Sequence, residues 1–365
     1  MPGPSLSLSI DPELFAASAL MYDRELVDGL FLKSGFWAAH KEVHGEGKPY
    51  WDNAPRRVDA ITIGTHSTLT ATPTGTEEID TTQSQSLTEF VWRPGYTQSP
   101  VLISGLERRT TSGAGQMIDL WKQRAEAVHG NFWRKTAQHF VAGGVSGLAD
   151  ANWNSLNGID RTYGFLEAAA VGSQSRTVGG LSKATYSAVP GLNNQYYAGG
   201  GSFINNGLVA LDYMLTVLEK RAEDPSAIYL LASEAGKRWL KRAIRPLERF
   251  NDGKPANAGT PIEYFGKFKV LNEEYMPVST TYGGSASASA PMTFAFVDFK
   301  RIFCCFGKPV NDADNPLPSG FFGMTKPTFL AGNVDVIAAK KQLFGQLVCK
   351  GLASSGVAAN LETWS

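Results

Sequence analysis

The sequence has few cysteines and no long hydrophobic run. Cys304 and Cys305 are adjacent within the apolar segment 301–306, and the third cysteine is Cys349. Their spacing matches no zinc pattern, so we expect buried strand residues that behave as small hydrophobes in a reducing compartment. No apolar run approaches the ~20 residues that a membrane helix needs, and residues 1–7 lack the features of a secretory signal. We therefore expect a soluble protein, made in the cytoplasm of a cell, with no membrane partner.

Charge is also scarce, and it is balanced. Charged residues make up 19% of the chain, below the ~25% of an average globular protein, and 34 Lys and Arg residues balance 34 Asp and Glu residues. A dedicated nucleic-acid-binding protein usually carries a basic excess, which this chain lacks. A container for nucleic acid is not excluded, because a shell need not neutralise the phosphate groups itself.

The motifs of several enzyme classes are missing as well. His40 and His44 stand four residues apart, but Glu42 is at the wrong position for a zinc protease motif. No third ligand is evident, so we expect these histidines to lie on a solvated polar face. The glycine run 199–201 precedes a predicted helix without the Lys-Ser/Thr of a phosphate loop, which indicates a simple turn.

His129 and His139 are not accompanied by a Gly-x-Ser-x-Gly elbow, so we expect them to pack or make polar contacts along a helix. Small basic clusters leave three interpretations open: ion pairs between subunits, a solvated face, or DNA contact. These clusters are Arg56-Arg57, Arg108-Arg109, and the group Arg238, Lys241, Arg242 and Arg245. The sequence therefore predicts no catalytic residue, no metal site and no cofactor.

Residues 56–104 have the composition of strands. Thr, Ser and β-branched residues dominate without helical periodicity, and Gly and Pro interrupt them. The part around 72–86 is polar and carries few large apolar residues. A long β-hairpin with so little core is not stable alone in water, so we expect it to lie on another surface.

Residues 113–142 show the strongest helical pattern. Gly143 and Gly144 provide the stop signal after it. A helix of about 30 residues is ~45 Å long, well beyond the ~11–12 residues of an average helix. The apolar residues near helical spacing are Met117, Leu120, Trp121, Val128, Phe132 and Phe140. A single long helix beside a long hairpin is an unusual pair for a compact enzyme.

The rest of the chain alternates between helices and strands, which predicts an α+β fold. Leucines at 3-4-3 spacing mark one helix, and Ser233 is a typical N-cap for the next. We expect loops and short strands over 145–205, a helix over 207–221, a buried strand over 227–231, a helix from Ser233 to before Pro246, and strands over 260–349.

The order of these elements resembles the Hong Kong 97-type major capsid proteins of tailed bacteriophages. Those proteins have an arm, a strand-rich hairpin, one long helix, a Gly-rich turn and a mixed α/β region that ends in strands. Short segments that are similar to the family cover nearly the whole chain. They are Asn154-Ser-Leu-Asn-Gly-Ile-Asp160, Thr177-Val-Gly-Gly-Leu-Ser182, Pro225-Ser-Ala-Ile-Tyr-Leu-Leu-Ala-Ser-Glu-Ala-Gly236, Gly345-Gln-Leu-Val348 and Asn360-Leu-Glu-Thr-Trp364.

This resemblance implies a division of the chain and explains the core-poor hairpin, which would lie across a neighbouring subunit. Symmetric repetition of such contacts closes a shell. The implied parts are the N-terminal arm (1–54), the extended loop (55–105), the peripheral domain with the spine helix (106–150), the axial domain around five-fold and six-fold axes (151–330), and the C-terminal strands that return to the peripheral domain (331–365).

The implied function is self-assembly, as hexamers and pentamers, into the icosahedral head shell of a virion made in a bacterial cytoplasm. The implied partners are a portal protein, a separate scaffolding protein, in some phages a decoration protein, and the enclosed double-stranded DNA, which is held without sequence-specific binding. Some family members cross-link their subunits through a Lys–Asn isopeptide bond promoted by Glu. Residues 58–104 contain no Lys, so we do not expect that reaction here.

Two other functions stay open. An encapsulin-type compartment shell has the same fold and would enclose a cargo enzyme, without a tail or portal. A hydrolase or other α/β enzyme would need His129 or His139 in a closed cleft, against a carboxylate.

Overall fold

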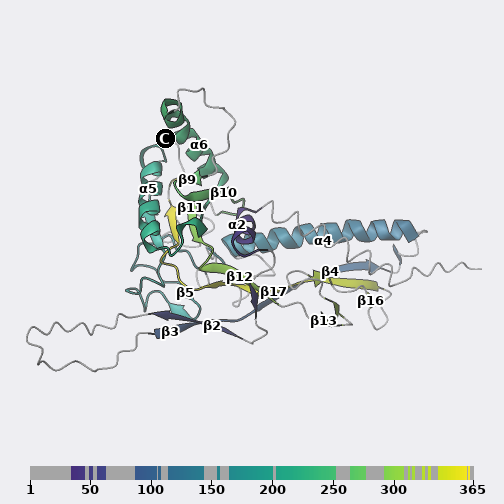
Figure 1. The fold of residues 1–365 in the computed structure, drawn as a ribbon. Helices are drawn as coiled ribbons and strands as arrows, with labels where there is room; N and C mark the ends of the chain where they lie inside the picture. Colours follow the sequence, from purple (N-terminus) through teal and green to yellow (C-terminus); the bar gives the residue numbers. More distant parts are fainter. Residues whose placement is uncertain are drawn as a thin grey trace, which may run out of the picture.

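The computed structural model describes residues 34–45, 49–51, 56–62, 87–104, 106–107, 114–143, 154–156, 164–199, 203–251, 264–276, 292–307, 311–312, 315–316, 323–324, 328–329, 336–359 and 361. The arm before residue 34 and the polar hairpin part around 72–86 lie outside the described residues. The described residues form two six-stranded sheets, the helices that pack on them, and smaller hairpins (Figure 1). The predicted α+β fold class is confirmed.

One six-stranded sheet is organised around the long strand β17 (Val336–Cys349). The C-terminal end of β17 is antiparallel to β12 (Ile302–Gly307), and the rest of β17 is antiparallel to β4 (Gly95–Ser104). The two stretches meet at Gly345, where an added Cβ would lie 2.5 Å from the carbonyl oxygen of Cys305, so only glycine fits. The sheet is completed by β1 (Tyr50–Trp51), β15 (Gly323–Met324) and β16 (Thr328–Phe329).

The second six-stranded sheet is mixed, with the strand order β7, β18, β11, β8, β10, β9. The strands are β7 (Gln195–Ala198), β8 (Ile228–Ala232), β9 (Tyr264–Phe265), β10 (Phe268–Asn272), β11 (Met292–Asp298) and β18 (Gly356–Ala359). All residues of β8 are buried, because side chains from its two faces join two different hydrophobic clusters. The predicted buried strand at 227–231 is confirmed within one residue.

Helices α5 (Phe203–Arg221) and α6 (Glu234–Asn251) cover one face of this second sheet. The predicted helix over 207–221 is confirmed, although it begins four residues earlier, at Phe203. Ser233 caps α6 as predicted, because its Oγ accepts a hydrogen bond from the backbone N–H of Gly236 at 3.1 Å. The predicted end before Pro246 is wrong. Proline removes one backbone donor from a helix, but here the helix continues past it to Asn251.

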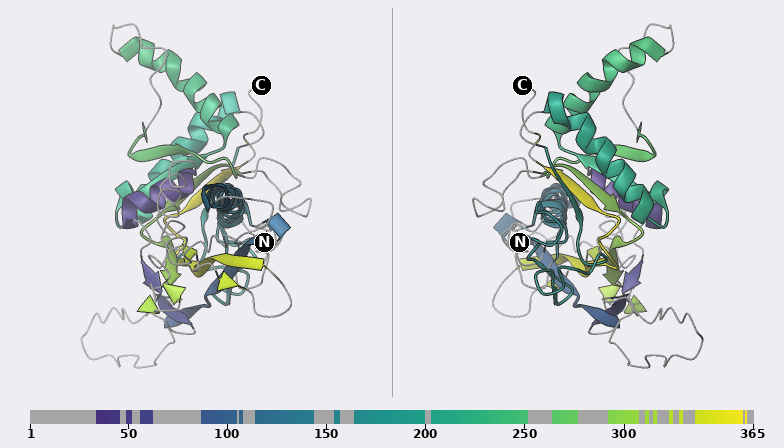
Figure 2. Two further views of the ribbon diagram at one scale, coloured as in Figure 1. Left: turned by 90° about the vertical axis from the view of Figure 1, so that its right-hand side faces the viewer. Right: turned by 90° about the vertical axis from the view of Figure 1, so that its left-hand side faces the viewer.

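The predicted long helix is α4 (Ala114–Ala142). It ends at Gly143, whose φ of 80° is in the left-handed region and whose N–H reaches the carbonyl oxygen of His139 at 2.7 Å. Figure 1 shows α4 extending away from the body of the molecule above β4 and β16, and Figure 2 shows it end-on. In these views α5 and α6 lie at one end of the body, and the hairpin β2–β3 lies at the other.

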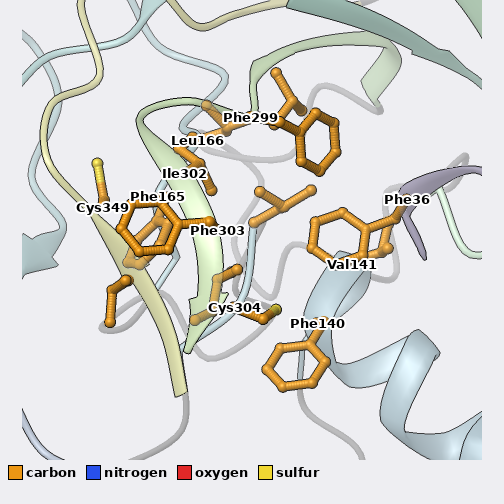
Figure 3. Close-up of a cluster of buried hydrophobic side chains, with 14 of the residues drawn as sticks. Phe36, Phe140, Val141, Phe165, Leu166, Phe299, Ile302, Phe303, Cys304 and Cys349 are labelled. Carbon is orange, nitrogen blue, oxygen red and sulfur yellow. The ribbon is translucent and has the colours of Figure 1, made fainter. Parts of the chain in front are cut away.

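The largest cluster of buried side chains joins the two sheets, α4 and α2 (Gly35–His44). Figure 3 shows how Phe36 of α2 and Phe140 of α4 approach Phe299, Ile302 and the residues of β12. The Phe36 and Phe140 rings are stacked with their centroids 6.5 Å apart, and the centroids of Phe36 and Phe299 are 5.4 Å apart. Segments from the start, middle and end of the chain therefore share one core.

Within the part of the chain that the structure describes, three antiparallel pairs of strands lie outside these two sheets. One pair is β2 (Arg57–Thr62) with β3 (Leu87–Trp92). Together with β4 of the first sheet, these strands confirm the predicted strands of the region 56–104. The others are β5 (Thr177–Val178) with β6 (Leu181–Ser182), and β13 (Asn311–Asp312) with β14 (Asn315–Pro316). The short strands β5, β6 and β7 agree with the prediction of loops and short strands over 145–205.

Candidate assembly surfaces

The β2–β3 hairpin has one covered face and one open face. Side chains alternate between the two faces of a strand. Phe90 and Trp92 point to the inner face and are buried, whereas Val58 and Leu87 on the outer face are 44% and 59% exposed. The strands β2 and β3 lie at the lower edge of the body in Figure 1. The outer face of the hairpin therefore exposes apolar side chains together with Glu89 and Thr62.

Aromatic and polar contacts hold the root of this hairpin on the body. The ring centroids of Phe90 and Trp92 are 5.4 Å apart, and Trp92 meets Phe165 edge-on at 5.5 Å. Arg57 donates to Asp59 at 2.9 Å, and its guanidinium carbon lies 5.3 Å from the centroid of the buried Phe303 ring. Arg57, one residue of the first predicted basic cluster, thus makes its ion pair within its own subunit.

Strand β4 also has one covered face. Val101 and Ile103 are buried against Trp121 and Ala125 of α4. Residues of even number point the other way, and there Tyr96 is 52% exposed and Leu102 is 44% exposed. Exposed Gln98 and Pro100 lie between them on the same face, so this open face carries a large apolar side chain toward each end.

Helix α4 is fixed to the end of β4 by a charged side chain. Arg124 of α4 pairs with Glu107 and donates to the carbonyl oxygen of Leu102. Glu107 in turn accepts a hydrogen bond from the backbone N–H of Ser104 at 3.0 Å. This half-exposed ion pair fixes the position of α4 relative to the C-terminal end of β4.

The histidines of α4 are part of its packing. His129 and His139 are both buried along the helix. The prediction that they pack along a helix is therefore confirmed.

Helices α5 and α6 present their outer sides at the end of the molecule far from the hairpin (Figure 2). On α5, Val209 and Tyr213 are exposed one helical turn apart. On α6, Arg238 of the predicted basic group forms an exposed ion pair with Glu234, at 2.9 Å and in the same helix. Such an exposed pair contributes little to stability. The cluster Arg108-Arg109 and the side chain of Arg245 lie outside the described residues.

The predicted solvated face of His40 and His44 is wrong for His40. His40 is 1% exposed, and its Nε2 accepts a hydrogen bond from the backbone N–H of Cys304 at 3.0 Å. The side of α2 that carries both histidines faces the core, where Phe36 and Trp37 are also buried. Burial, together with the charge of His44, lowers the pKa of His40 to about 3, so the ring is neutral at ordinary pH. The described residues contain no group of three His, Cys, Asp or Glu side chains arranged for a metal ion.

Both ends of α2 are fixed to the second sheet by contacts that the sequence did not predict. The buried Glu273 carboxylate accepts from the N–H of Phe36 at 2.7 Å and from Ser34 Oγ at 2.8 Å. Burial raises the pKa of Glu273, while the hydrogen bonds at the helix N-terminus favour its charged form. Near the other end, Lys269 contacts Glu42 at 2.7 Å. A separation of 237 positions between Phe36 and Glu273 leaves no local signal for this contact.

A buried polar network was also missed, and its centre is Lys183. The Lys183 ammonium donates to Phe165 O at 2.7 Å, Asn194 Oδ1 at 3.0 Å and Gln174 Oε1 at 3.1 Å. Burial lowers the pKa of Lys183 to about 7, against the opposing effect of the Glu167 charge. Nothing in the local sequence marks this lysine as buried, because it follows the small residues of a turn.

Glu167 extends the network toward the β5 strand. Its carboxylate accepts from the backbone N–H groups of Ser175 at 3.0 Å and Arg176 at 3.2 Å. Its own N–H donates to Asn194 Oδ1 at 2.9 Å. The residues on both sides of the β5–β6 hairpin are therefore attached to the interior by charged or amide side chains.

The prediction that the cysteines are buried strand residues is confirmed. Cys304, Cys305 and Cys349 are buried free thiols in β12 and β17. Burial raises the pKa of Cys305 and of Cys349 to about 12, so both stay protonated and are poor nucleophiles. Among the helices that the structure describes, none has both the length and the apolar character needed to cross a membrane.

No family model matches this chain, and no curated protein matches it. Solved structures do. The capsid of cyanophage A-1(L) is similar with a TM-score of 0.61 and 10% identity, over 91% of this chain and 93% of that chain. The capsid of the native GTA particle is similar with a TM-score of 0.57 and 14% identity, over 88% of this chain and 89% of that chain.

The chain has the Hong Kong 97-type capsid fold. The resemblance inferred from the order of elements is thereby confirmed at the level of the fold. At 10–14% identity the capsid fold is shared with few identical side chains, so the contacts described above are those of this chain. The open faces of the hairpin, β4 and α5 are its candidate assembly surfaces.

Proposed function

We propose that this chain is the major capsid protein of a tailed bacteriophage, and that many copies assemble into the icosahedral head shell. The observation that carries the proposal is the capsid fold itself, which extends over about nine tenths of the chain. The half-covered elements support it. A hairpin and a strand with apolar outer faces make physical sense when neighbouring copies cover them.

The proposed division of the chain follows the capsid fold. Residues 1–54 are the N-terminal arm, 55–105 the extended loop, 106–150 the peripheral domain, 151–330 the axial domain, and 331–365 the returning C-terminal strands. Two features support this division: α4 is a single long helix, and β17 returns to pair with β4.

The contacts between copies use the three open faces. Val58 and Leu87 on the hairpin, Tyr96 and Leu102 on β4, and Val209 with Tyr213 on α5 supply the exposed apolar side chains. Each contact is small, but every subunit makes several of them at once. Multivalent contacts of this kind give a stable shell from individually weak interfaces.

The proposed partners follow from the same role. Copies of the chain form hexamers and pentamers, a portal protein occupies one vertex, and a separate scaffolding protein directs assembly. A decoration protein on the outer surface belongs to the same proposal. The shell encloses double-stranded DNA without sequence-specific binding, which fits the zero net charge of the chain. The chain acts in the virion as a structural protein and not as an enzyme, after synthesis in the cytoplasm of a bacterial host.

The experiment is electron microscopy of the purified protein, expressed alone and with the neighbouring phage genes. Closed shells of uniform size are the expected result. A protein that stays monomeric under both conditions contradicts the proposal. Shells that copurify with a cargo enzyme, and never with a portal, indicate an encapsulin-type compartment instead.

A further inference from the structure

The root of the β2–β3 hairpin rests on the turn between β5 and β6, beside it in Figure 1. The backbone N–H of Val91 donates to the carbonyl oxygen of Gly179 in this turn at 2.9 Å. Gly179 has a φ of +55°, and a Cβ added there would lie 2.7 Å from Cδ1 and 2.8 Å from Cβ of Phe90. The backbone of the turn at Gly179 therefore contacts the side chain of Phe90 in the hairpin, and there is no space for a methyl group on Gly179.

A second glycine makes the same kind of approach. A Cβ added at Gly191 would lie 3.3 Å from Cδ1 of Ile61, on the opposite strand of the hairpin. Ile61 and Phe90 both point to the buried face of the hairpin. The hairpin is thus supported under both of its strands by glycine backbone.

The turn that carries Gly179 is itself attached to the interior. On one side, Arg176 donates its N–H to the buried Glu167 carboxylate and its guanidinium to the carbonyl oxygen of Leu166 at 2.6 Å. On the other side, Lys183 makes its three buried hydrogen bonds, and its N–H reaches the carbonyl oxygen of Arg176 at 2.9 Å. A turn fixed at both ends cannot retreat when the residue at its tip becomes larger.

We propose that Gly179 is a positioning residue that sets the direction of the hairpin relative to the body of the subunit. This inference rests on the proposed shell function, because it assigns the contact that aims one of the assembly surfaces. A methyl group at this position pushes Phe90 outward by about 1 Å, whereas Trp92 stays against Phe165. Phe90 and Trp92 are about 7 Å apart along β3, so this displacement rotates the β2–β3 hairpin by roughly 8°.

The neighbouring residue offers a matched control. Gly180 also has a positive φ, of +84°, but a Cβ added there meets nothing within 4 Å. The Gly180→Ala variant therefore introduces the backbone strain of an L-residue in the left-handed region without the contact with Phe90. Comparison of Gly179→Ala with Gly180→Ala separates the contact from the strain.

The test measures the direction of the hairpin and the yield of shells separately. Spin labels on Ala60→Cys in β2 and Ala127→Cys in α4, two exposed positions, report the distance distribution between hairpin and body in the dissociated full-length subunit. The three native cysteines are buried and do not compete for the label. We expect a shifted or broadened distribution for Gly179→Ala, and a distribution like that of the native sequence for Gly180→Ala. We also expect about tenfold fewer shells for Gly179→Ala than for Gly180→Ala, because a misaligned contact is repeated at every equivalent interface.

The outcomes separate the two proposals. Identical distance distributions for the two alanine variants overturn the positioning role, whatever the particles do. A native chain that never forms shells overturns the shell function, while the distance measurement still decides the role of Gly179. If Gly179→Ala does not fold, Phe90→Leu takes its place. This variant makes the side chain that contacts Gly179 smaller and adds no backbone strain. An unchanged distance distribution in Phe90→Leu rejects the inference.

Discussion

Strand β8 and strand β4 show two ways in which this chain uses a sheet. Both faces of β8 are covered by the subunit itself, by α5 and α6 on one side and by the main core on the other. β4 is covered by α4 on one face only, and its other face exposes Tyr96 and Leu102. The β2–β3 hairpin repeats the pattern of β4. The described fold thus contains strands that the subunit covers on both faces and strands that it covers on one face only, and the proposed shell function assigns the open faces to neighbouring copies.

The largest effect should come from removing the end of the hairpin. Deletion of residues 66–86 leaves β2, β3 and the core contacts of the described residues in place, so the subunit should stay folded and soluble. Closed particles should disappear, because the hairpin no longer reaches a neighbour. Circular dichroism of the deletion variant checks that the subunit is folded, and electron microscopy checks that closed particles are absent. Shells of normal size and number from this variant would refute the assignment of the hairpin to contacts with neighbouring copies.

A change inside the body should instead destabilise the subunit. The Lys183→Met variant removes the buried donor of three hydrogen bonds, and Phe165 O loses it while Asn194 Oδ1 and Gln174 Oε1 each keep one backbone N–H. Because the buried Glu167 charge also loses its nearby cation, we expect a loss of about 3–5 kcal/mol in the free energy of unfolding. Urea unfolding of the dissociated subunit measures it. The matched control is Lys220→Met, at an exposed position of α5, which should change stability by less than about 0.5 kcal/mol.

The same lysine predicts a dependence on pH. The folded pKa of Lys183 is lowered to about 7, below its value of about 10.4 in an unfolded chain. Between these values the unfolded chain binds the extra proton, so the contribution of Lys183 to stability rises with pH from 7 toward 10. The stability difference between the native sequence and Lys183→Met should therefore be larger at pH 9 than at pH 7. An equal difference at both pH values contradicts the lowered pKa of the buried Lys183.

His40 gives a smaller effect of acid on the body. Its folded pKa of about 3 lies below the unfolded value of about 6.5, so stability is lost as the pH falls below 6.5. Between pH 6.5 and pH 5 we expect a loss of about 2 kcal/mol from this residue, at about 1.4 kcal/mol per pH unit. The His40→Gln variant should lose this part of the acid sensitivity in thermal unfolding. His44→Gln is the control, because His44 is only half-buried and should contribute less.

The smallest effect on folding should come from the open face of β4. The double variant Tyr96→Ser and Leu102→Ser should change the free energy of unfolding by less than about 0.5 kcal/mol per site, because both side chains are about half exposed. The yield of shells should fall if neighbours cover this face. Val101→Ser is the contrasting variant, since Val101 is buried against α4 and its change should destabilise the subunit. A shell yield unaffected by the double variant removes β4 from the contact surfaces.

The parts of the fold that local patterns determine could be read from the sequence. The long helix α4 was recognised from apolar spacing and from Gly143, and β8 from a short apolar run. The extension of α6 past Pro246 was missed, because a proline weakens a helix without always ending it.

The missed contacts join distant segments. His40 was expected in solvent because two histidines at i,i+4 look the same on a buried face and on an open one. The Glu273 cap and the Lys183 network depend on which chain segments meet in space, and no local spacing records that. The open faces were anticipated only as a hairpin with too little core. The residues on these open faces could not be predicted, because the sequence alone does not show which side of each strand faces the body.

The pairing of β4 with β17 has a mechanical consequence. The two strands are joined by ten consecutive residue pairs, from Val336 with Ser104 to Gly345 with Gly95, and β17 then continues into the core beside β12. A force along the β4–β17 pair therefore loads the hydrogen bonds between the two strands together in shear, instead of breaking them one after another. If copies form the proposed shell, tension in its wall would pass from β4 along one continuous strand into the core of the subunit.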